Sequence, residues 1–576
     1  MKLTENKLHL AWYVSACLLA VFTYFYGLDG QHIPKNGDEY PYEHIVRLTA
    51  ASGDLLPLQS QMENMRNTKP PLLFWQGITS TGWGKDWTLW QLRYPSVIYT
   101  LLTAAMLFLL GWKLTGKLET GFIAALTFLA FFTTYRFGRP FLTNPPEVFW
   151  IFLPFFVLLH WRQTFESRFV IPLLLGISIG IGFLYKSFAL GLPVTLGLAG
   201  WYLHQRHYRV LAFFRQDALK VVIAMSVAVT MFAMWFVLDP NPQAVWKEFV
   251  LGENIGKFDP HGPGYLEKLL WGGSSLWSYT LAFLTNAGLL TFIVVALFFV
   301  ACKNRNQLSH EEKLLWILVA VFFFSFSLPS QRSGRYLLDV MPAVALLCAL
   351  NWQQISRQAF VASLVMAGAA VAGIAYLSVR LQAGMTGVQM FPPGFWLLLS
   401  GTGTLTLLAI AVSGLTRSSL NAVALLVLLC LAGFLKPLDG ELGNYAADAR
   451  LYAQGKDVWV PCNFRAKDEG HRFILPGAEI HGYSEDQNLT VDELAARYPL
   501  FAVQAPLNIN VQTIGCDNCK VIGQRLDIRG RHSPAELKEM FLEGKVFQHL
   551  FIREILMESP GGGKVLLTES LAQTCR

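Results

Sequence analysis

The sequence predicts a helical protein that crosses a membrane many times and carries a small mixed α/β domain after its last span. Of its 576 residues, 53% are hydrophobic and only 15% are charged, and the mean hydropathy is +0.39. Soluble globular chains carry about 25% charged residues, so much of this chain is expected to lie in lipid. Its apolar residues recur in runs near the length of about 20 residues that crosses a bilayer as a helix. Continuous runs of this kind select helices rather than barrel strands.

Thirteen candidate spans are predicted between residues 10 and 436. The first, at residues 10–28, follows a short basic start. It is interpreted as a retained anchor rather than a cleaved signal peptide, because its end is rich in aromatic residues and lacks a clear cleavage site. The other spans are predicted near residues 94–112, 120–135, 146–160, 169–185, 188–203, 219–238, 277–301, 314–329, 336–351, 359–378, 395–413 and 419–436.

Basic residues give the predicted orientation. Lys and Arg gather in alternate short connections, such as the one with Lys113 and Lys117 and the one with Arg206 and Arg209. Short connections of this kind lie in the cytoplasm. With a basic N-terminus and an odd number of spans, this predicts long outer loops at about 29–92 and 239–275. The chain after about residue 437 is then expected on the outer side. The net charge of +7 is assigned to loops, so no nucleic-acid partner is expected.

The predicted domains are a transmembrane domain at residues 1–436 and an outer domain at 437–576. In the second part, residues 457–464 and 500–508 have the pattern of short strands. A helix is predicted at 533–546, because Ser533 precedes it and Glu536 follows three residues later, which is a capping-box spacing. This combination predicts a mixed α/β domain.

Four cysteines fall in the predicted outer domain: Cys462, Cys516, Cys519 and Cys575. Four cysteines in an oxidising compartment usually form two disulfides, with three pairings open. The CDNC stretch at 516–519 could instead be half of a zinc site or a redox motif. No second CxxC or His pair accompanies it, which favours structural disulfides.

Basic residues also lie near the outer ends of several predicted spans, where the charge rule does not place them. Any one of them could extend its charge to lipid headgroups. Their presence in several separate outer segments instead suggests an anionic partner such as a lipid-linked phosphate, because Lys and Arg are the side chains that bind phosphate groups. These residues are Lys69, Arg136, Arg139, Lys186, Arg332 and Arg335.

An acidic cluster opens the first outer loop, in the stretch NGDEYPYEH at residues 36–44. A sugar that leaves a lipid phosphate is attacked by an acceptor, and a carboxylate can take the acceptor's proton or orient it. Asp38, Glu39 and Glu43 are therefore candidates, although acidic residues are also common in solvated loops. A divalent metal held by carboxylates is a further alternative, and no cofactor is predicted with certainty.

Five segments resemble the bacterial C-type membrane glycosyltransferases, in the branch of the protein O-mannosyltransferases and the lipid A aminoarabinose transferase. GDEYPYEHIVRLTAASGDLLP followed by KPPLLFW resembles the first outer loop of that superfamily. RYPSVIYTLL at 93–102, FLYKSFAL at 183–190 and SGRYLLDVMPAVALL at 333–347 resemble segments at its second, fifth and tenth spans. The resemblance covers roughly residues 1 to 350. The predicted layout, with a domain after the last span, is similar as well.

The resemblance implies an inverting transfer of a sugar from a polyprenyl-phosphate donor, at the periplasmic face of a bacterial inner membrane. The acceptor would be lipid A, another envelope glycan or a protein, and the sugar is left open. Asp38 is implied as the main catalytic residue, with Glu39 beside it and Glu43 held as a lesser candidate. The residues implied to contact the donor phosphate are Lys69, Lys186, Arg335 and Tyr336.

One position departs from the superfamily pattern. The second outer loop there commonly carries an Asp shortly before a Pro, whereas RPFLTNPPEVFW at 139–150 has Asn144 at that place. An amide cannot act as a base, so a mechanism with two carboxylates is in doubt. Glu147 could replace the missing charge, or simply complement the dipole of the helix that it begins. Arg139 is a further candidate for substrate binding in this loop.

The other long outer loop contains ENIGKFDPHGPGYLEK at 253–268. Its Gly and Pro content predicts irregular structure, and a loop of this length often binds a ligand or covers a site. Lys257, His261 and Tyr265 are candidate substrate contacts.

The alternative to an enzyme is a transporter or flippase of lipid-linked sugars. Transporters place charged residues near the middle of the membrane, whereas here the ionisable residues gather at the outer ends of the spans.

Overall fold

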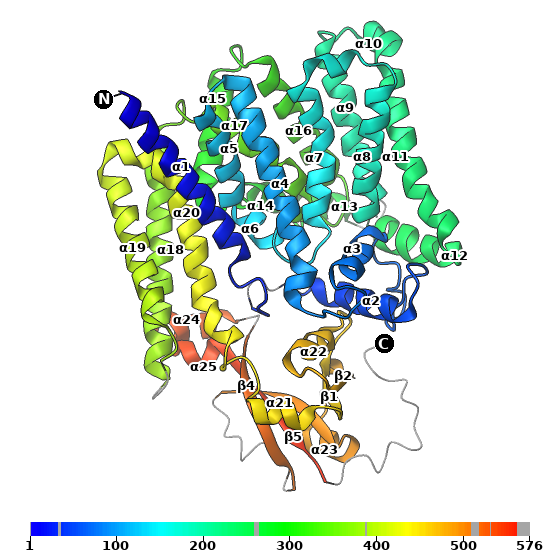
Figure 1. Cartoon of the computed structure of the whole chain (residues 1–576), viewed down its shortest axis with the longest axis vertical. Helices are drawn as coiled ribbons and strands as arrows, with labels where there is room; N and C mark the ends of the chain where they lie inside the picture. The colour runs from blue at the N-terminus through cyan, green and yellow to red at the C-terminus, as the bar shows by residue number, and fades with distance from the viewer. Residues whose placement is uncertain are drawn as a thin grey trace.

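The computed structural model describes residues 2–32, 36–257, 264–385, 389–507, 516, 518–529 and 532–560, with side chains from residue 10 onward. A large helical bundle occupies most of the molecule, and a small sheet with short helices lies at one end of it (Figure 1). The protein is thus mostly helical with a small C-terminal sheet, as the sequence predicts.

Within the described residues, twenty α-helices precede the C-terminal part of the chain. They are α1 (Lys2–Phe25), α2 (Glu39–Ser52), α3 (Leu72–Ser80), α4 (Leu89–Thr115), α5 (Leu118–Ala130), α6 (Phe132–Phe137), α7 (Asn144–His160), α8 (Val170–Tyr185), α9 (Gly191–Gln205), α10 (Val210–Gln216), α11 (Ala218–Leu238), α12 (Pro242–Val245), α13 (Tyr265–Leu270), α14 (Leu276–Thr285), α15 (Thr291–Lys303), α16 (His310–Ser327), α17 (Met341–Leu350), α18 (Arg357–Gly384), α19 (Pro393–Ala411) and α20 (Ser413–Leu435).

Five of the described helices are long and apolar enough to cross a membrane: α4, α11, α18, α19 and α20 with the turn that follows it. A sixth span results if α14 and α15 count as one, although they meet at an angle of 101°. Several predicted spans are interrupted. The predicted span at 120–135 is divided between α5 and α6, and the span at 336–351 begins as the 3-10 segment η6 (Gly334–Val340) before α17. This criterion therefore gives fewer spans than the sequence predicts.

The C-terminal part contains a five-stranded sheet in the order β2-β1-β3-β5-β4. Strand β1 is parallel to β2 and β3, and β5 is antiparallel to β3 and β4. The strands are β1 (Asp457–Cys462), β2 (Glu479–Ser484), β3 (Leu500–Pro506), β4 (Lys520–Ile528) and β5 (Phe551–Glu558). The helices of this part are α21 (Ala447–Ala453), α22 (His471–Ile474), α23 (Val491–Arg497), α24 (Pro534–Leu542) and α25 (Val546–Leu550).

Successive side chains along each strand point to opposite faces of the sheet, and apolar side chains form a cluster on each face. Val458 and Val460 on β1 pack with Ala502 in one cluster, whereas Trp459 and Phe501 belong to the other. This follows from the period of two that places successive side chains on opposite faces. Because both faces are covered, the sheet forms a packed unit.

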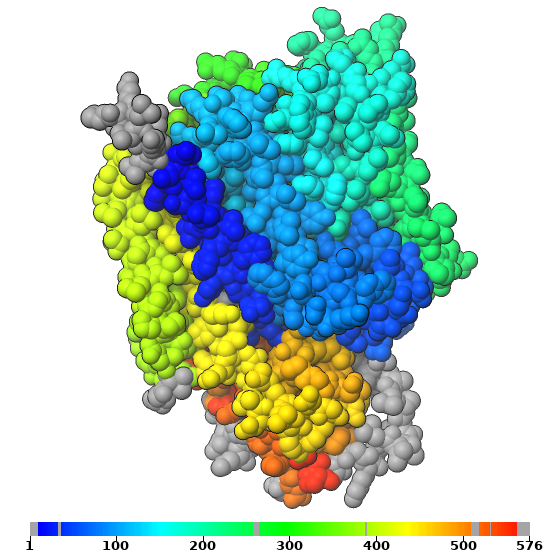
Figure 2. Space-filling view, in the orientation of Figure 1, coloured from blue at the N-terminus to red at the C-terminus, as the bar shows by residue number. Residues whose placement is uncertain are grey.

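The sheet end of the molecule packs against the first outer loop. Residues near 470 contact α2, and in Figure 2 the yellow and orange atoms of the C-terminal part lie directly against the blue N-terminal part. His32 lies between the carboxylates of two residues from the C-terminal half of the chain. Its Nδ1 is 3.0 Å from Asp439, which follows α20, and its Nε2 is 3.0 Å from Asp527 on β4. Trp87 stacks on Phe473 with ring centroids 5.9 Å apart. The loop that carries the acidic cluster is therefore held between the helical bundle and the sheet.

Candidate active site

Asp38 lies immediately before α2 and between two guanidinium groups. Its Oδ2 is 2.5 Å from Nη1 of Arg335, and its Oδ1 is 3.3 Å from Nη1 of Arg465. Arg335 belongs to η6, whereas Arg465 follows β1 in the C-terminal part. The side chain of Asp38 remains 36% exposed, so a reacting group can reach it.

The contacts of Arg335 continue into a longer polar network. Its Nε donates to Oδ1 of Asn144 at 2.6 Å, and the Asn144 amide lies 3.3 Å from Oε2 of Glu147. Nζ of Lys186 donates to the same Glu147 oxygen at 2.7 Å. The Lys186 ammonium also lies 5.7 Å from the ring centroid of Tyr336. The structure thus brings together Asp38 and five other predicted site residues, which lie on α7 and η6, immediately before α2 and immediately after α8.

A cavity of about 640 Å³ opens beside this network. Asp38 forms part of its wall, and three guanidinium groups from different segments face it, those of Arg136, Arg335 and Arg465. Phosphate oxygens bind guanidinium groups through paired, charge-assisted hydrogen bonds. The other lining residues are Asn36, Gly37, Phe132, Thr133, Phe137, Ala282, Thr285, Asn286 and Ser333. The wall of the cavity therefore combines the carboxylate of Asp38 with three guanidinium groups.

Lys69 forms an ion pair with Glu253 of the π-helical segment η3 (Trp246–Asn254). Tyr42 on α2 lies within the electrostatic influence of both Glu253 and Asp38. Burial raises the pKa of Tyr42 the most, Arg335 lowers it, and Asp38 and Glu253 raise it. Tyr42 therefore lies close enough to both groups to sense their charges.

Glu39 has a different environment from its neighbour Asp38. It is 2% exposed, and its two carboxylate oxygens accept from Nε and Nη2 of Arg93 at 2.8 and 2.9 Å. Oε1 also accepts from the backbone N–H of Phe141 at 2.7 Å. Glu43 is 1% exposed, and burial followed by the charge of Glu39 raises its pKa well above the usual range. These contacts position the loop, and they leave Asp38 as the accessible carboxylate.

Two further candidates, Arg139 and Tyr265, have separate surroundings. Arg139 is fully buried, donates to the backbone carbonyls of Tyr24 and Tyr26, and lies 4.5 Å from the ring centroid of Tyr135. Its contacts are therefore with the end of α1. The Tyr265 hydroxyl donates to the Leu328 carbonyl at 2.6 Å.

Two candidates of the second long loop have no described side chain. Lys257 ends the short turn η4 (Ile255–Lys257), of which only the backbone is described at this position. His261 lies outside the described residues. Their predicted contacts with substrate stay predictions.

Cys516 and Cys519 form a disulfide with an S–S distance of 2.05 Å, so the CDNC stretch closes on itself. Cys462 is disulfide-bonded as well, and Cys575 lies outside the described residues. Within the described ranges, no group of three or more His, Cys, Asp or Glu side chains could hold a metal ion. The divalent metal stays an untested alternative.

Sequence reasoning missed two residues that contact or surround the site. Arg465 directly follows the predicted strand at 457–464, where polar side chains often emerge from a sheet edge, but nothing in the sequence connects it to residue 38. Tyr42 lies one helical turn after Asp38 in the same short motif, and this spacing could have drawn attention to it.

Comparison with known proteins shows which families and folds the chain is similar to. The family described as dolichyl-phosphate-mannose-protein mannosyltransferase matches residues 37–249. An undecaprenyl phosphate-alpha-4-amino-4-deoxy-L-arabinose arabinosyl transferase of Sodalis glossinidius is 27% identical over 346 residues, which cover 58% of this chain and 57% of the relative. A protein of the same description from Proteus mirabilis is 25% identical over 350 residues, covering 58% of this chain and 59% of the relative. The match thus spans less than two thirds of these relatives' length.

The fold is also similar to that of a solved structure. The crystal structure of ArnT from Cupriavidus metallidurans bound to undecaprenyl phosphate aligns with a TM-score of 0.61 at 15% sequence identity. The alignment covers 95% of this chain and 98% of that one, so the C-terminal sheet is included as well as the helical bundle. The chain is thus similar to the dolichyl-phosphate-mannose-protein mannosyltransferase family over residues 37–249, and its fold is similar to that of ArnT.

Proposed function

We propose that this protein is an inverting glycosyltransferase that moves a sugar from a polyprenyl-phosphate donor to an envelope acceptor. One observation carries the proposal: Asp38 lies between two guanidinium groups at the wall of a basic cavity of about 640 Å³. The arabinosyl transferases it resembles are named for an undecaprenyl phosphate-linked sugar. A donor of that class, with a long lipid and an anionic phosphate, fits a basic cavity beside apolar helices.

The proposed reaction is a displacement at the anomeric carbon. An acceptor oxygen attacks that carbon, the new glycosidic bond forms, and the bond to the donor phosphate oxygen breaks. The electron pair leaves with the polyprenyl phosphate, while Asp38 takes or orients the acceptor proton. Arg335 and Lys186 would stabilise the negative charge that develops on the leaving phosphate. When the phosphate binds Arg335, that guanidinium no longer has to neutralise Asp38, which makes the carboxylate available to the acceptor.

The proposed setting is a bacterial inner membrane crossed about thirteen times. Residues 1–436 would form the transmembrane domain with the N-terminus in the cytoplasm, and residues 437–576 the periplasmic domain. The alternate basic loops support this orientation, as does the acidic and basic cluster at one end of the bundle. Lipid A, another glycan or a protein would be the acceptor.

The test compares the mass of lipid A from a host that makes polyprenyl-linked sugar donors. Cultures would express the protein, its Asp38→Asn variant, or Asp54→Asn, a matched control at an exposed aspartate of the same loop. We expect a sugar-sized mass gain with the protein and with Asp54→Asn, and none with Asp38→Asn. A gain that survives in Asp38→Asn would contradict the assigned role. If no culture shows a gain, the same variants would be compared on other envelope glycans and proteins.

A further inference from the structure

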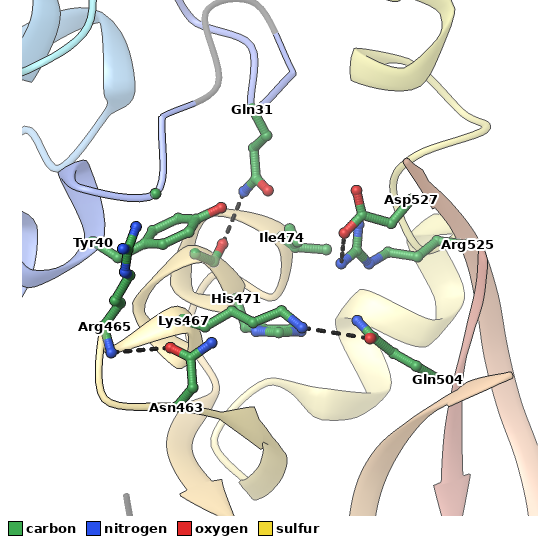
Figure 3. A pocket seen from close by; sticks show the side chains of 12 residues that line it. Gln31, Tyr40, Asn463, Arg465, Lys467, His471, Ile474, Gln504, Arg525 and Asp527 are labelled. Atoms are coloured by element: carbon green, nitrogen blue, oxygen red, sulfur yellow. Dashed lines mark hydrogen bonds and ion pairs between the residues drawn. The ribbon is translucent and has the colours of Figure 1, made fainter. Parts of the chain in front are cut away.

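A second cavity lies where the C-terminal part meets the first outer loop. It has a volume of about 130 Å³ and is drawn in Figure 3. Gly37 and Arg465 belong to its wall and also to the wall of the cavity that contains Asp38. The two cavities therefore adjoin on either side of these residues. A group bound in the second cavity lies next to the proposed reaction centre.

The wall of this junction cavity is organised by one buried carboxylate. Glu554 on β5 is 0% exposed and accepts from Nε of Arg525 at 2.7 Å and from the Gln504 amide at 3.2 Å. Nε2 of His471 lies 3.2 Å from both Glu554 oxygens, and the Tyr445 hydroxyl donates at 2.9 Å. A buried carboxylate with this many donors fixes their side chains in place. His471, Gln504 and Arg525 consequently face the cavity in set orientations.

His471 also has a polar atom with no partner. Its Nε2 faces the Glu554 carboxylate and so carries a proton, whereas Nδ1 is buried and has no hydrogen-bond partner among the described residues. The whole side chain is only 3% exposed, and it lines the cavity. A buried polar atom without a partner is uncommon in folded proteins. A ligand hydroxyl that donates to Nδ1 would satisfy it.

The charges around the cavity are balanced. Each cation of its wall has an acidic partner: Arg465 pairs with Asp38, Lys467 with Glu485, and Arg525 with Glu554. A wall of this kind has little net attraction for an anion. It does offer donors and acceptors side by side, including the Asn463 and Gln504 amides. Hydroxyl groups, which both donate and accept, match such a wall.

Two less polar side chains complete the cavity. The ring of Tyr40 and the side chain of Ile474 line it together with the polar residues, as Figure 3 shows. Sites for small molecules usually combine apolar surface with a few fixed polar groups that set orientation. The C–H face of a sugar ring can rest on such surface while its hydroxyls bond to the rim.

We propose that the junction cavity is the subsite for a neutral sugar unit of the acceptor. This inference rests on the proposed glycosyl transfer, and it narrows the acceptor from any envelope molecule to one that presents a saccharide. The cavity is built mainly from the C-terminal part, so that part would select the acceptor. Arg465, shared by both cavities, would contact the acceptor sugar on one side and Asp38 on the other.

Saccharide binding to the full chain in lipid nanodiscs tests the inference without requiring turnover. Saturation-transfer NMR would measure N-acetylglucosamine as the neutral probe and glucose 6-phosphate as the anionic probe. For one sugar ring we expect a Kd on the order of 10 mM for the neutral probe, and weaker binding of the phosphate. His471→Phe removes the Nδ1 acceptor from the cavity wall, and Lys467→Ala removes a donor from its rim. Each should weaken binding about tenfold or more.

His549→Phe is the matched control, because His549 also bonds a carboxylate, that of Glu539 at 2.9 Å, but does not line the cavity. It should bind the neutral probe like the unaltered chain. Lys467→Ala keeps the inference testable if His471→Phe fails to fold, since Lys467 lies at the partly exposed rim. Absence of neutral-sugar binding, tighter binding of glucose 6-phosphate, or equal affinity in all variants would overturn the inference.

The outcome is separable from that of the proposed function. Asp38→Asn should abolish donor turnover, whereas N-acetylglucosamine should still bind in the junction cavity, because Asp38 itself does not line it. If the sugar binds but Asp38→Asn has no effect on turnover, the proposed mechanism is contradicted and the acceptor subsite is not. If turnover depends on Asp38 but no sugar binds in the junction cavity, the acceptor subsite is contradicted and the proposed mechanism is not.

Discussion

Asp38 and Glu39 are adjacent in the sequence but occupy opposite physical environments. Asp38 is partly exposed between two guanidinium groups, whereas Glu39 is buried in a two-point ion pair with Arg93. Arg93 also donates to the backbone carbonyls of Leu28 and Gly30. An ion pair with these additional hydrogen bonds fixes the loop between α1 and α2, and thereby holds Asp38 at the cavity.

We expect Glu39→Gln to lower the free energy of unfolding by about 3–5 kcal/mol, because it leaves Arg93 buried without its counter-charge. The exposed pair of Asp29 and Lys436, 3.7 Å apart, serves as the control. Asp29→Asn should lower the free energy of unfolding by less than about 1 kcal/mol. Reversible unfolding of the reconstituted protein would measure both. Equal losses in the two variants would contradict the structural role of Glu39.

Arg335 contacts two different acceptors, Asp38 and Asn144, through separate nitrogens of one planar group. Removal of one positioned donor to a developing anion typically lowers kcat by about 10²–10³, so Arg335→Ala should have an effect of that size. Arg335→Lys should recover little activity, because a single ammonium cannot reproduce the two-point geometry. Release of polyprenyl phosphate from a labelled donor would measure the rates. Full activity in the lysine variant would show that charge alone is sufficient.

At the level of elements, α2 is held to the C-terminal part by one buried carboxylate. Glu469 of η8 (Lys467–Gly470) accepts from His44 Nδ1 at 2.6 Å and from Arg47 Nη2 at 2.5 Å, both on α2. Arg472 bonds its other oxygen at 3.1 Å. Burial alone would raise the pKa of Glu469, but these donors outweigh it and lower the pKa to about 2. The contact therefore joins the acidic loop to the sheet.

A lowered carboxyl pKa stabilises the folded state above the pKa of the unfolded chain, here 4.5, and this stabilisation is lost as the pH falls toward about 2. At neutral pH we expect Glu469→Gln to be less stable by on the order of 3 kcal/mol. The difference from the unaltered protein should shrink between pH 4.5 and 2. Hydrogen exchange of α2 as a function of pH would follow it. A difference that stays constant across this range would contradict the assignment.

At the level of the whole molecule, the C-terminal part contributes a side chain to the candidate active site. Arg465 reaches Asp38 from the segment after β1, and Gln31 in the first outer loop donates to the Gly470 carbonyl at 2.8 Å. The site is therefore assembled from two parts of the chain that are far apart in sequence. Loss of the C-terminal part would remove Arg465 and one wall of each cavity.

We expect Arg465→Ala to lower turnover about tenfold, a smaller effect than that of Arg335→Ala, because Arg465 is half exposed and its contact with Asp38 is longer. Its charge is then screened more strongly by solvent. Arg497→Ala, at the end of α23 in the same part, is the control and should be neutral. Deletion of residues 440–576 should abolish transfer. Undiminished transfer after that deletion would show that the C-terminal part has no role in the reaction.

Much of the architecture could be predicted because local rules determine it. Apolar run length predicts helices, and the short strand-like stretches at 457–464 and 500–508 lie near β1 and β3 of the structure. The capping-box spacing correctly predicts that Ser533 precedes a helix. The number of spans was harder to predict, because breaks such as the 101° bend between α14 and α15 depend on packing rather than on hydropathy.

The sequence by itself determined a helical membrane-type chain with a small sheet and an acidic cluster next to its first apolar segment. It also identified Asp38, Asn144, Glu147, Lys186, Arg335 and Tyr336, which the structure brings into one network. Only the tertiary structure decided which carboxylate is accessible and which is buried, and that Arg465 contacts Asp38. The physical reason is distance along the chain: the two partners of Asp38 lie 297 and 427 positions away. A local pattern of charge or hydropathy cannot predict ion pairs between residues this far apart in the sequence.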